Sequence, residues 1–280
     1  MRIKSFDNKN VLYLVATPIG NLADITLRAL EILKSVDIIY AEDTRNSLVL
    51  LKHYNITTHL ESYHNYNEEE KTDLIINQLK DGMNIAIISD AGLPVISDPG
   101  FKIVKKAREL GYPVSTIPGA SAGISALISS GLAPLPYTFY GFLDSKESKR
   151  KAELNELKYL KHTIIFYEAP HRIFETLNDM LEVLGDRNVV LARELTKKFE
   201  EYIIGNISDI LAEDTIKGEI VLMVEGYKEE KEDNVSYNEK IDELINLGYK
   251  PNDAIKEVAK MYNTDKKELY KEYVNYKNKE

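Results

Sequence analysis

One short apolar segment, followed at once by a polar turn, places the strongest limits on what this chain can fold into. The segment Ile85–Ile88 is too short for a helix and rich in β-branched residues, which is typical of a buried parallel strand. The turn Ser89–Gly92 follows directly, and ligands of open α/β sheets bind at the carboxyl ends of strands. There the Asp90 carboxylate can accept hydrogen bonds, while Gly92 lets backbone approach closely. The alternative is structural: two tight turns, of which the second, Ser97–Gly100, caps the following helix.

The same arrangement of a short apolar run and a polar turn recurs along the chain. Segments such as Glu68–Lys80, with Leu74, Ile75 and Leu79 facing inward, separate the runs and are typical of amphipathic helices. Strands that alternate with helices predict an α/β fold. We expect a helix capped by Asp24 after the first strand, and strands over residues 11–16, 37–40, 113–117, 163–167, 188–191 and 220–224.

Shifts in composition divide the 280 residues into parts. Gly131–Tyr140 is rich in proline and aromatic residues and is interpreted as a linker into a second half. From about Lys228 the chain turns to Lys, Glu, Asn and Tyr, and Lys228–Asn238 is interpreted as a charged linker. We therefore predict one α/β domain over residues 1–118, a second over 119–228, and a linker with a helical segment over 229–280.

The segment after the charged linker contains three short helical patterns. They cover Glu239–Leu247, Pro251–Met261 and Asp265–Val274, with a small core expected from Ala254, Val258, Leu269 and Tyr270. This spacing fits a helix-turn-helix, which often docks on nucleic acid but also serves as a plain packing unit. Because the segment's charge is balanced, both interpretations stay open.

Composition also limits the compartment and the chemistry. The chain has no cysteine, which excludes disulfides and a thiolate nucleophile. Its N-terminus does not have the pattern of a signal peptide, and no apolar run approaches the length of a membrane span, so we expect a cytoplasmic protein. The net charge of −9 argues against bulk electrostatic binding to nucleic acid, although local basic patches are compatible with it.

Charged clusters follow two of the expected strands. Glu42–Arg45 places acidic and basic side chains at a strand end, where they either cap a helix or face a substrate. Glu168–Arg172 places an acid, an imidazole and a guanidinium together at another strand end, which favours a site. The small residues of Pro118–Gly123 open a helix whose amides can cradle an anion. The spacing of His53, His59 and His64 does not match a zinc pattern, and the fingerprints of a dinucleotide site and a P-loop are absent.

Taken together, the strand-end segments resemble the small-subunit ribosomal RNA methyltransferase I family, in the tetrapyrrole-methylase-like class of S-adenosylmethionine methyltransferases. The segments that carry the resemblance are TPIGNLADITLRAL, AEDTR, SDAGLPVISDPG, PGASA, YEAPHR and ARELTKKFEE, in this order between about Val11 and Gly226. The resemblance implies two α/β domains with the cofactor in the cleft between them, usually in a homodimer, and a C-terminal helix-turn-helix segment.

The resemblance also implies a reaction and its site. The family uses S-adenosylmethionine to methylate the ribose 2′-hydroxyl of a cytidine in the decoding centre of 16S rRNA. The cofactor residues it implies here are Pro18 and Ile19 in the first turn, Asp90 and Leu93 in the central turn, Ser121 and Ala122 in the PGASA turn, and Tyr167, Arg193, Glu219 and Ile220 in the second half.

A 2′-hydroxyl is a poor nucleophile, so we expect an acid–base group or a nearby cation to assist it. The candidates are the members of the two charged clusters: Glu42, Asp43, Arg45, Glu168, His171 and Arg172. In this hypothesis the two arginines bind phosphates beside the acceptor ribose, and Asp43 or Glu168 orients or deprotonates its hydroxyl. Two other functions stay open: methylation of a tetrapyrrole or another small molecule, and a non-catalytic regulator that binds nucleic acid.

Overall fold

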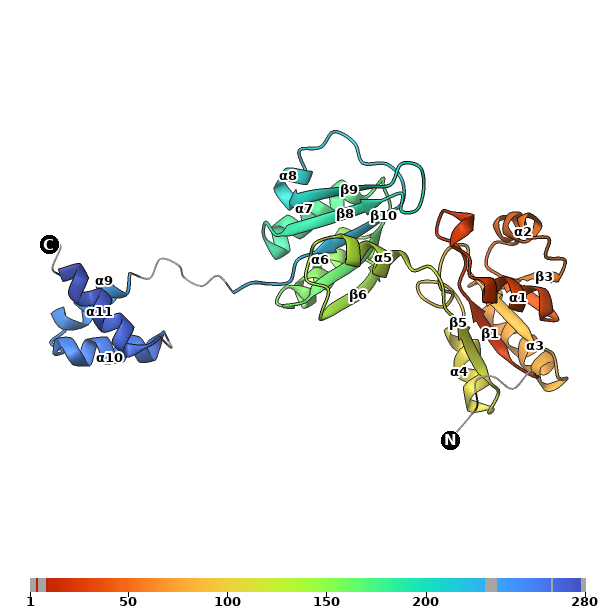
Figure 1. Cartoon of the computed structure of the whole chain (residues 1–280), viewed down its shortest axis with the longest axis horizontal. Helices are drawn as coiled ribbons and strands as arrows, with labels where there is room; N and C mark the ends of the chain where they lie inside the picture. The colour runs from red at the N-terminus through yellow and green to blue at the C-terminus, as the bar shows by residue number, and fades with distance from the viewer. Residues whose placement is uncertain (1–3, 5–8, 230–235, 263, 278–280) are drawn as a thin grey trace. The chain divides into compact units, whose positions relative to one another are not determined.

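The structure is a computed structural model that describes residue 4 and residues 9–229, 236–262 and 264–277. The chain forms two compact units, residues 1–227 and 228–280. The charged linker expected over 228–238 lies largely outside the described residues. Figure 1 shows two sheets in the first unit and a group of helices in the second.

The first sheet is wholly parallel, with strand order β3-β2-β4-β1-β5. Its strands are β1 (Leu12–Val15), β2 (Ile38–Ala41), β3 (His59–Ser62), β4 (Ile85–Ile88) and β5 (Val114–Ile117). The connections contain a short 3-10 helix, η1 (Leu22–Asp24), and the helices α1 (Leu27–Ser35), α2 (Thr44–His53), α3 (Glu68–Lys80) and α4 (Phe101–Glu109). The carboxyl ends of all five strands therefore lie at the same end of this sheet.

Helices cover both faces of the first sheet, and alternate residues of each strand point to opposite faces. Tyr13 and Val15 pack with α1 and α2 on one face, whereas Leu12 packs with α3 and α4 on the other. This explains why the strands are short continuous apolar runs rather than alternating patterns. Leu74, expected to face inward from α3, is 39% exposed, so that expectation is wrong.

The start of α1 differs from the sequence prediction. Asp24 was expected to cap the helix, but it ends the 3-10 turn η1 instead. The cap is Thr26, whose hydroxyl oxygen accepts a hydrogen bond from the Ala29 N–H at 3.1 Å. Threonine and aspartate are both good capping residues, so local chemistry alone does not separate the two positions.

The second sheet is mixed, with strand order β6-β7-β10-β8-β9. Its strands are β6 (Tyr137–Phe142), β7 (Thr163–Glu168), β8 (Asn188–Arg193), β9 (Glu201–Asn206) and β10 (Ile220–Val224). The helices of this part are α5 (Ala122–Ser129), α6 (Glu147–Leu157), α7 (Ile173–Leu184) and α8 (Ile207–Ile210). Side chains of α6, α7 and α8 pack on one face, whereas α5 and Ile19 pack on the other.

The direction of β10 decides which residues meet at one end of the second sheet. β10 lies between β7 and β8 and runs antiparallel to both. Ile220 at its start therefore pairs with Glu168 at the end of β7 and with Arg193 at the end of β8. The end of β7, the end of β8 and the start of β10, which are far apart in the sequence, thus lie together at one end of the sheet.

One ion pair is buried between α6 and α7. The Arg150 Nε donates a hydrogen bond to Asp179 Oδ2 at 2.6 Å, and the two side chains are 3% and 8% exposed. The Arg150 Nη1 also donates to the Ser145 carbonyl oxygen at 3.2 Å, and the Lys151 Nζ lies 3.5 Å from Asp179 Oδ1. The loss of either partner would remove the shortest ion pair of a buried charge, which is costly.

The unit formed by residues 228–280 is a small group of three helices, drawn in blue in Figure 1. They are α9 (Tyr237–Asn246), α10 (Pro251–Met261) and α11 (Lys266–Lys277). Ala254, Val258 and Leu269 are buried as expected, but Tyr270 is 46% exposed and Tyr273 takes its place in the core. The α/β fold and the helical C-terminal segment are thus confirmed. Within the described residues, every helix is too short or too polar to cross a membrane.

Candidate functional site

A cavity of about 600 Å³ opens within the unit formed by residues 1–227. Its wall consists of the loop after β4, the start of α5, aromatic residues of β6, the segment after β7 and the start of β10. A two-way backbone bridge supports the loop after β4: the Thr17 N–H donates to the Gly92 oxygen at 2.9 Å, and the Gly92 N–H donates to the Thr17 oxygen at 3.1 Å. The turns after β1 and β4 are therefore held together beside the cavity.

Most of the residues that the resemblance implies for the cofactor line this cavity. They are Ile19, Asp90, Leu93, Ser121, Ala122, Tyr167, Glu219 and Ile220. Pro18 and Arg193 are not among the lining residues. The Arg193 Nε donates to the Lys217 carbonyl oxygen at 2.8 Å, and its Nη1 lies 2.7 Å from a Glu201 carboxylate oxygen. The guanidinium of Arg193 thus joins strand ends of the second sheet.

An aromatic group forms part of the cavity wall. The Tyr167 ring lies edge-on to Phe139 and Phe142, with ring centroids 5.1 and 5.6 Å apart. Burial raises the pKa of the Tyr167 hydroxyl. A Cβ placed on Gly123 would lie 3.4 Å from the Phe139 ring, so a small residue at this turn of α5 keeps the packing close. Neither phenylalanine was predicted as a site residue, because Phe139 lies in the segment Gly131–Tyr140 that was interpreted as a linker and Phe142 lies in the polar segment that follows it.

The charged residues that line the cavity are all acidic. They are Asp90, Asp98, Glu168 and Glu219, and the described lining residues include neither lysine nor arginine. Apolar and aromatic residues make up much of the remaining wall. Such a lining favours a ligand that carries positive charge and an apolar body, and disfavours a nucleoside di- or triphosphate.

The cluster Glu42–Arg45 contacts the cavity through Asp90. The Asp90 carboxylate accepts hydrogen bonds from the Asp43 N–H at 3.3 Å and from the Asn46 side chain at 3.0 Å. Asp43 itself pairs with Arg45, whose Nη2 lies 2.7 Å from Oδ2. Hydrogen bonds from Arg45 lower the pKa of Asp43 to about 2. The Arg45 side chain is 89% exposed, so an anion can reach it from solvent.

The cluster Glu168–Arg172 is more deeply built into the fold. The buried Glu168 accepts hydrogen bonds from the Thr176 hydroxyl at 2.6 Å and from the Ala169 N–H at 2.8 Å. The Arg172 Nη2 donates to the carbonyl oxygens of Leu143 and Asp144 at 3.1 and 3.0 Å. His171 is exposed. Of this cluster, only Glu168, Ala169 and Pro170 line the cavity.

Asp98 lines the cavity, although its turn, Ser97–Gly100, was expected only to cap the following helix. Burial, together with the negative charge of Glu42, raises the pKa of Asp98 to about 7. The N-cap of α4 is instead Gly100, whose φ of 134° is tolerated only by glycine. Proximity of Asp98 to Glu42 is a tertiary contact, and the sequence contained no local signal for it.

The backbone around Asp98 has an unusual conformation. Val95 and Ser97 have φ values of 77° and 66°, a region that non-glycine residues rarely adopt and β-branched residues almost never. A Cβ on Gly100 would lie 2.9 Å from Val95 Cγ2, so this loop is also tightly packed on itself. Conformations of this kind cost on the order of 1–3 kcal/mol each and cluster at ligand sites.

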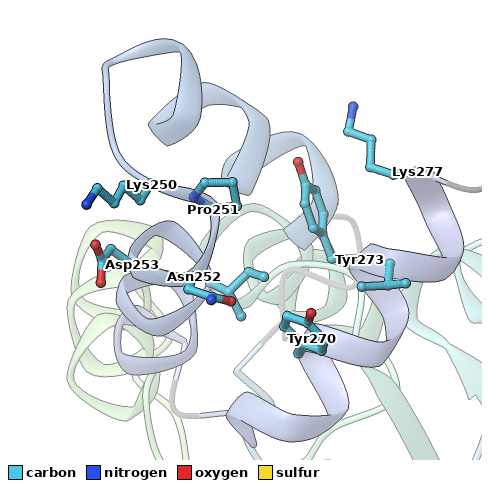
Figure 2. A pocket seen from close by; sticks show the side chains of 9 residues that line it. Lys250, Pro251, Asn252, Asp253, Tyr270, Tyr273 and Lys277 are labelled. Atoms are coloured by element: carbon cyan, nitrogen blue, oxygen red, sulfur yellow. The ribbon is translucent and has the colours of Figure 1, made fainter.

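A second pocket, of about 670 Å³, lies on the C-terminal unit between α10 and α11. Figure 2 shows Lys250 and Lys277 at opposite sides of this pocket, with Asn252 and the half-exposed Tyr270 among the side chains between them. The Lys277 Nζ lies 2.9 Å from Asp242 Oδ2. In the described part of the chain, no group of three His, Asp or Glu side chains is placed to hold a metal ion.

Comparison with known proteins identifies the family of the chain. The family model of Tetrapyrrole (Corrin/Porphyrin) Methylases matches residues 11–211. The chain belongs to this family. Within it, the chain is 48% identical over 285 residues to ribosomal RNA small subunit methyltransferase I of Bacillus subtilis, covering 97% of this chain and 98% of that protein. It is 47% identical over 272 residues to the protein of the same name from Haemophilus influenzae, covering 94% of this chain and 96% of the relative.

Solved structures show the same methylase fold at low sequence identity. Uroporphyrin-III-C-methyltransferase from Thermus thermophilus superposes with a TM-score of 0.55 and 19% identity, over 77% of this chain and 94% of that one. Diphthine synthase superposes with a TM-score of 0.59 and 14% identity, over 77% and 89% of the two chains. The resemblance inferred from the strand-end segments is confirmed, and the chain is a member of a methyltransferase family.

Proposed function

We propose that this chain uses S-adenosylmethionine to methylate the ribose 2′-hydroxyl of a cytidine in the decoding centre of 16S rRNA. The proposal is supported by identity of 45–49% to relatives named ribosomal RNA small subunit methyltransferase I over nearly their whole length. It is carried by one structural observation, the cavity in which eight of the ten expected cofactor residues meet. We further propose that the enzyme works in the cytoplasm as a homodimer.

The residues around the cavity suit S-adenosylmethionine in size and charge. Its volume of about 600 Å³ lies within the range of roughly 300–1,000 Å³ that small-molecule sites occupy. Asp90 and Glu219 offer carboxylates to a ligand with ammonium and sulfonium groups, and Tyr167 with its phenylalanine neighbours offers apolar surface to an adenine ring. When bound, the cofactor supplies a methyl group that is already activated for transfer.

The chain's own contribution is then to hold and orient the reactants. Asp90, fixed by the Asp43 N–H and the Asn46 side chain, orients the cofactor. Arg45 binds a phosphate beside the acceptor ribose, since a guanidinium matches the geometry of phosphate oxygens, whereas the Arg172 guanidinium is held by backbone carbonyl oxygens and does not line the cavity. Arg45→Ala is therefore expected to reduce transfer to the ribosomal subunit while S-adenosylmethionine affinity stays nearly unchanged.

The C-terminal unit gives this enzyme a separate surface for RNA. In the pocket of Figure 2, Tyr270 offers a ring on which an unpaired base can stack, and Lys250 and Lys277 offer charge for the flanking phosphates. A chain that ends at Gly226 is expected to bind S-adenosylmethionine normally and to methylate small subunits less efficiently. Equal activity of the shortened and complete chains across a salt series would contradict a role of this unit in RNA binding.

The function is tested with methyl-labelled S-adenosylmethionine and three acceptors. These are small ribosomal subunits that carry no ribose methylation in the decoding centre, large subunits, and a porphyrinogen. We expect label in 16S rRNA of the small subunit alone, at one cytidine whose 3′ linkage becomes resistant to alkali because its 2′-oxygen is methylated. Label in the porphyrinogen alone, or cofactor binding without transfer to any acceptor, would overturn the proposal.

A further inference from the structure

Asp98 occupies a distinctive place in the cavity. It reaches the cavity from the loop between β4 and α4, with Glu42 of the β2 end behind it. Glu42 and Asp98 are close enough to share a hydrogen bond, and the Ser89 hydroxyl also reaches Asp98. Tyr167, from the second sheet, lies near enough that the charge of Asp98 affects its hydroxyl. Asp98 is thus placed where both sheets contribute to the cavity.

Glu42 and Asp98 form a pair of partly buried carboxyl groups, and the negative charge of Glu42 disfavours the ionised form of Asp98 because like charges repel. Asp98 is the member of this pair that lines the cavity, whereas Glu42 does not. A ligand hydroxyl in the cavity can therefore form a hydrogen bond to Asp98 directly, whereas Glu42 can influence that hydroxyl only by acting on Asp98. This arrangement keeps a basic oxygen at the cavity wall.

We infer that Asp98, which lines the cavity, is the proton acceptor for the RNA hydroxyl, and that Glu42 beside it is a positioning residue. This inference rests on the proposed function, because it assumes a hydroxyl acceptor and a sulfonium methyl donor. The hydroxyl oxygen forms a bond to the methyl carbon, and the carbon–sulfur bond breaks with its electron pair remaining on sulfur. The hydroxyl proton passes to a carboxylate oxygen of Asp98.

The other carboxylates near the cavity have competing partners. Both oxygens of Asp43 bind the Arg45 side chain, and the resulting low pKa makes Asp43 a weak base. Both oxygens of Glu168 accept hydrogen bonds, one from Thr176 and one from Ala169. Asp98 differs from these residues because its closest carboxylate neighbour repels its negative charge instead of stabilising it.

The pH dependence follows from the groups that face Asp98. Burial, Glu42 and Asp90 raise the pKa of Asp98, and the hydroxyl of Ser89 lowers it, with a result of about 7. Tyr167 also faces Asp98 but stays neutral near this pH, since burial raises its pKa from 10.0. The rate of the chemical step is expected to rise with pH and to level off above about 7.

Three variants of the full-length protein test the inference: Asp98→Asn, Glu42→Gln, and Asp214→Asn as a control on an exposed loop. Single-turnover transfer to small subunits, at saturating cofactor and subunit, measures the chemical step. Asp98→Asn is expected to be slower by roughly 10²–10⁴-fold, with S-adenosylmethionine affinity by calorimetry changed less than about threefold. In Glu42→Gln the midpoint of the pH–rate profile is expected to move to lower pH, because a negative neighbour is removed. The control is expected to match the wild type.

A second readout does not depend on turnover. Carbon-13 NMR of carboxyl-labelled aspartate, with Asp98 assigned by loss of its signal in Asp98→Asn, reports the titration of Asp98 in the free protein. We expect a midpoint near 7 in the wild type and a lower one in Glu42→Gln. Near-wild-type rates in a folded Asp98→Asn protein, or identical pH profiles of the wild type and Glu42→Gln, would overturn the inference. No transfer by the wild type to any RNA would instead overturn the proposed function, while the NMR midpoint would still test the pair.

Discussion

The Asp98 carboxyl is expected to make the stability of the folded chain depend on pH in a way that one substitution removes. In the folded state its pKa is about 7, and its ordinary value is 3.8. Below pH 4 the folded and unfolded chains both hold the proton, so stability is unaffected. As pH rises toward 7, the unfolded chain releases this proton while the folded chain retains it, and stability falls. Above 7 the destabilisation is constant.

The size of this loss of stability follows from the difference between the folded-state pKa of Asp98 and its ordinary value. About three pKa units correspond to ~4 kcal/mol at 1.36 kcal/mol per unit, which is an upper limit. Asp98 is only partly buried and opens to the cavity, so solvent screening reduces the expected effect to ~1–2 kcal/mol. In Asp98→Asn the amide cannot ionise, and its NH₂ can donate a hydrogen bond to Glu42. The variant is therefore expected to be more stable than the wild type above pH 7.

Thermal unfolding of both proteins at pH 5 and pH 8 measures this difference. Roughly two-thirds of the wild-type destabilisation develops between these pH values. For a unit of this size, 1 kcal/mol corresponds to a Tm change of roughly 2–4 °C, so the Tm advantage of Asp98→Asn should grow by several degrees from pH 5 to pH 8. Asp214→Asn, on an exposed loop, should show no such growth. An equal Tm difference at both pH values would refute the raised pKa of Asp98.

Three further predictions concern other parts of the chain. Asp179→Ala removes the hydrogen-bonded carboxylate partner of the buried Arg150 guanidinium and should lower the free energy of unfolding by roughly 3–5 kcal/mol, measured in urea. A loss below about 1 kcal/mol, as expected at an exposed ion pair, would contradict burial of the pair. Asp90→Ala should weaken S-adenosylmethionine binding by about 1–3 kcal/mol in calorimetry; unchanged affinity of the folded variant would remove Asp90 from the cofactor site. Tyr270→Ala should raise KM for small subunits without changing kcat or cofactor affinity, and the similarly exposed Tyr249→Ala should not; equal KM values in the two variants would argue against base stacking on Tyr270.

The strands that the sequence predicted and those that it missed differ in their place in the sheets. Runs such as Ile85–Ile88 and Ile220–Val224 are buried on both faces, so their apolar residues are continuous and easy to recognise. The missed strands β3, β6 and β9 all lie at sheet edges and are partly exposed. An edge strand needs only one partner and tolerates polar residues, so its pattern is weak.

The candidate site shows the same division between local and tertiary information. Asp90 and Ser121 lie in turns directly after recognisable strands, and the sequence alone drew attention to both turns. Phe139 was missed because neighbouring prolines suggested a linker, although proline is compatible with the beginning of an edge strand. Asp98 was treated as a capping residue because its interaction with Glu42 joins two strand ends that are distant in the sequence.

The central position of β10 has a consequence for how the protein is made. β7 and β8 each pair with β10 and not with one another, so the second sheet lacks its middle until residues 220–224 have left the ribosome. A nascent chain that stops earlier exposes an open edge on each of these two strands, and exposed edges invite pairing with other chains. It also lacks Ile220 and Val221 of the cavity wall. The protein can therefore complete its ligand site only late in its own translation.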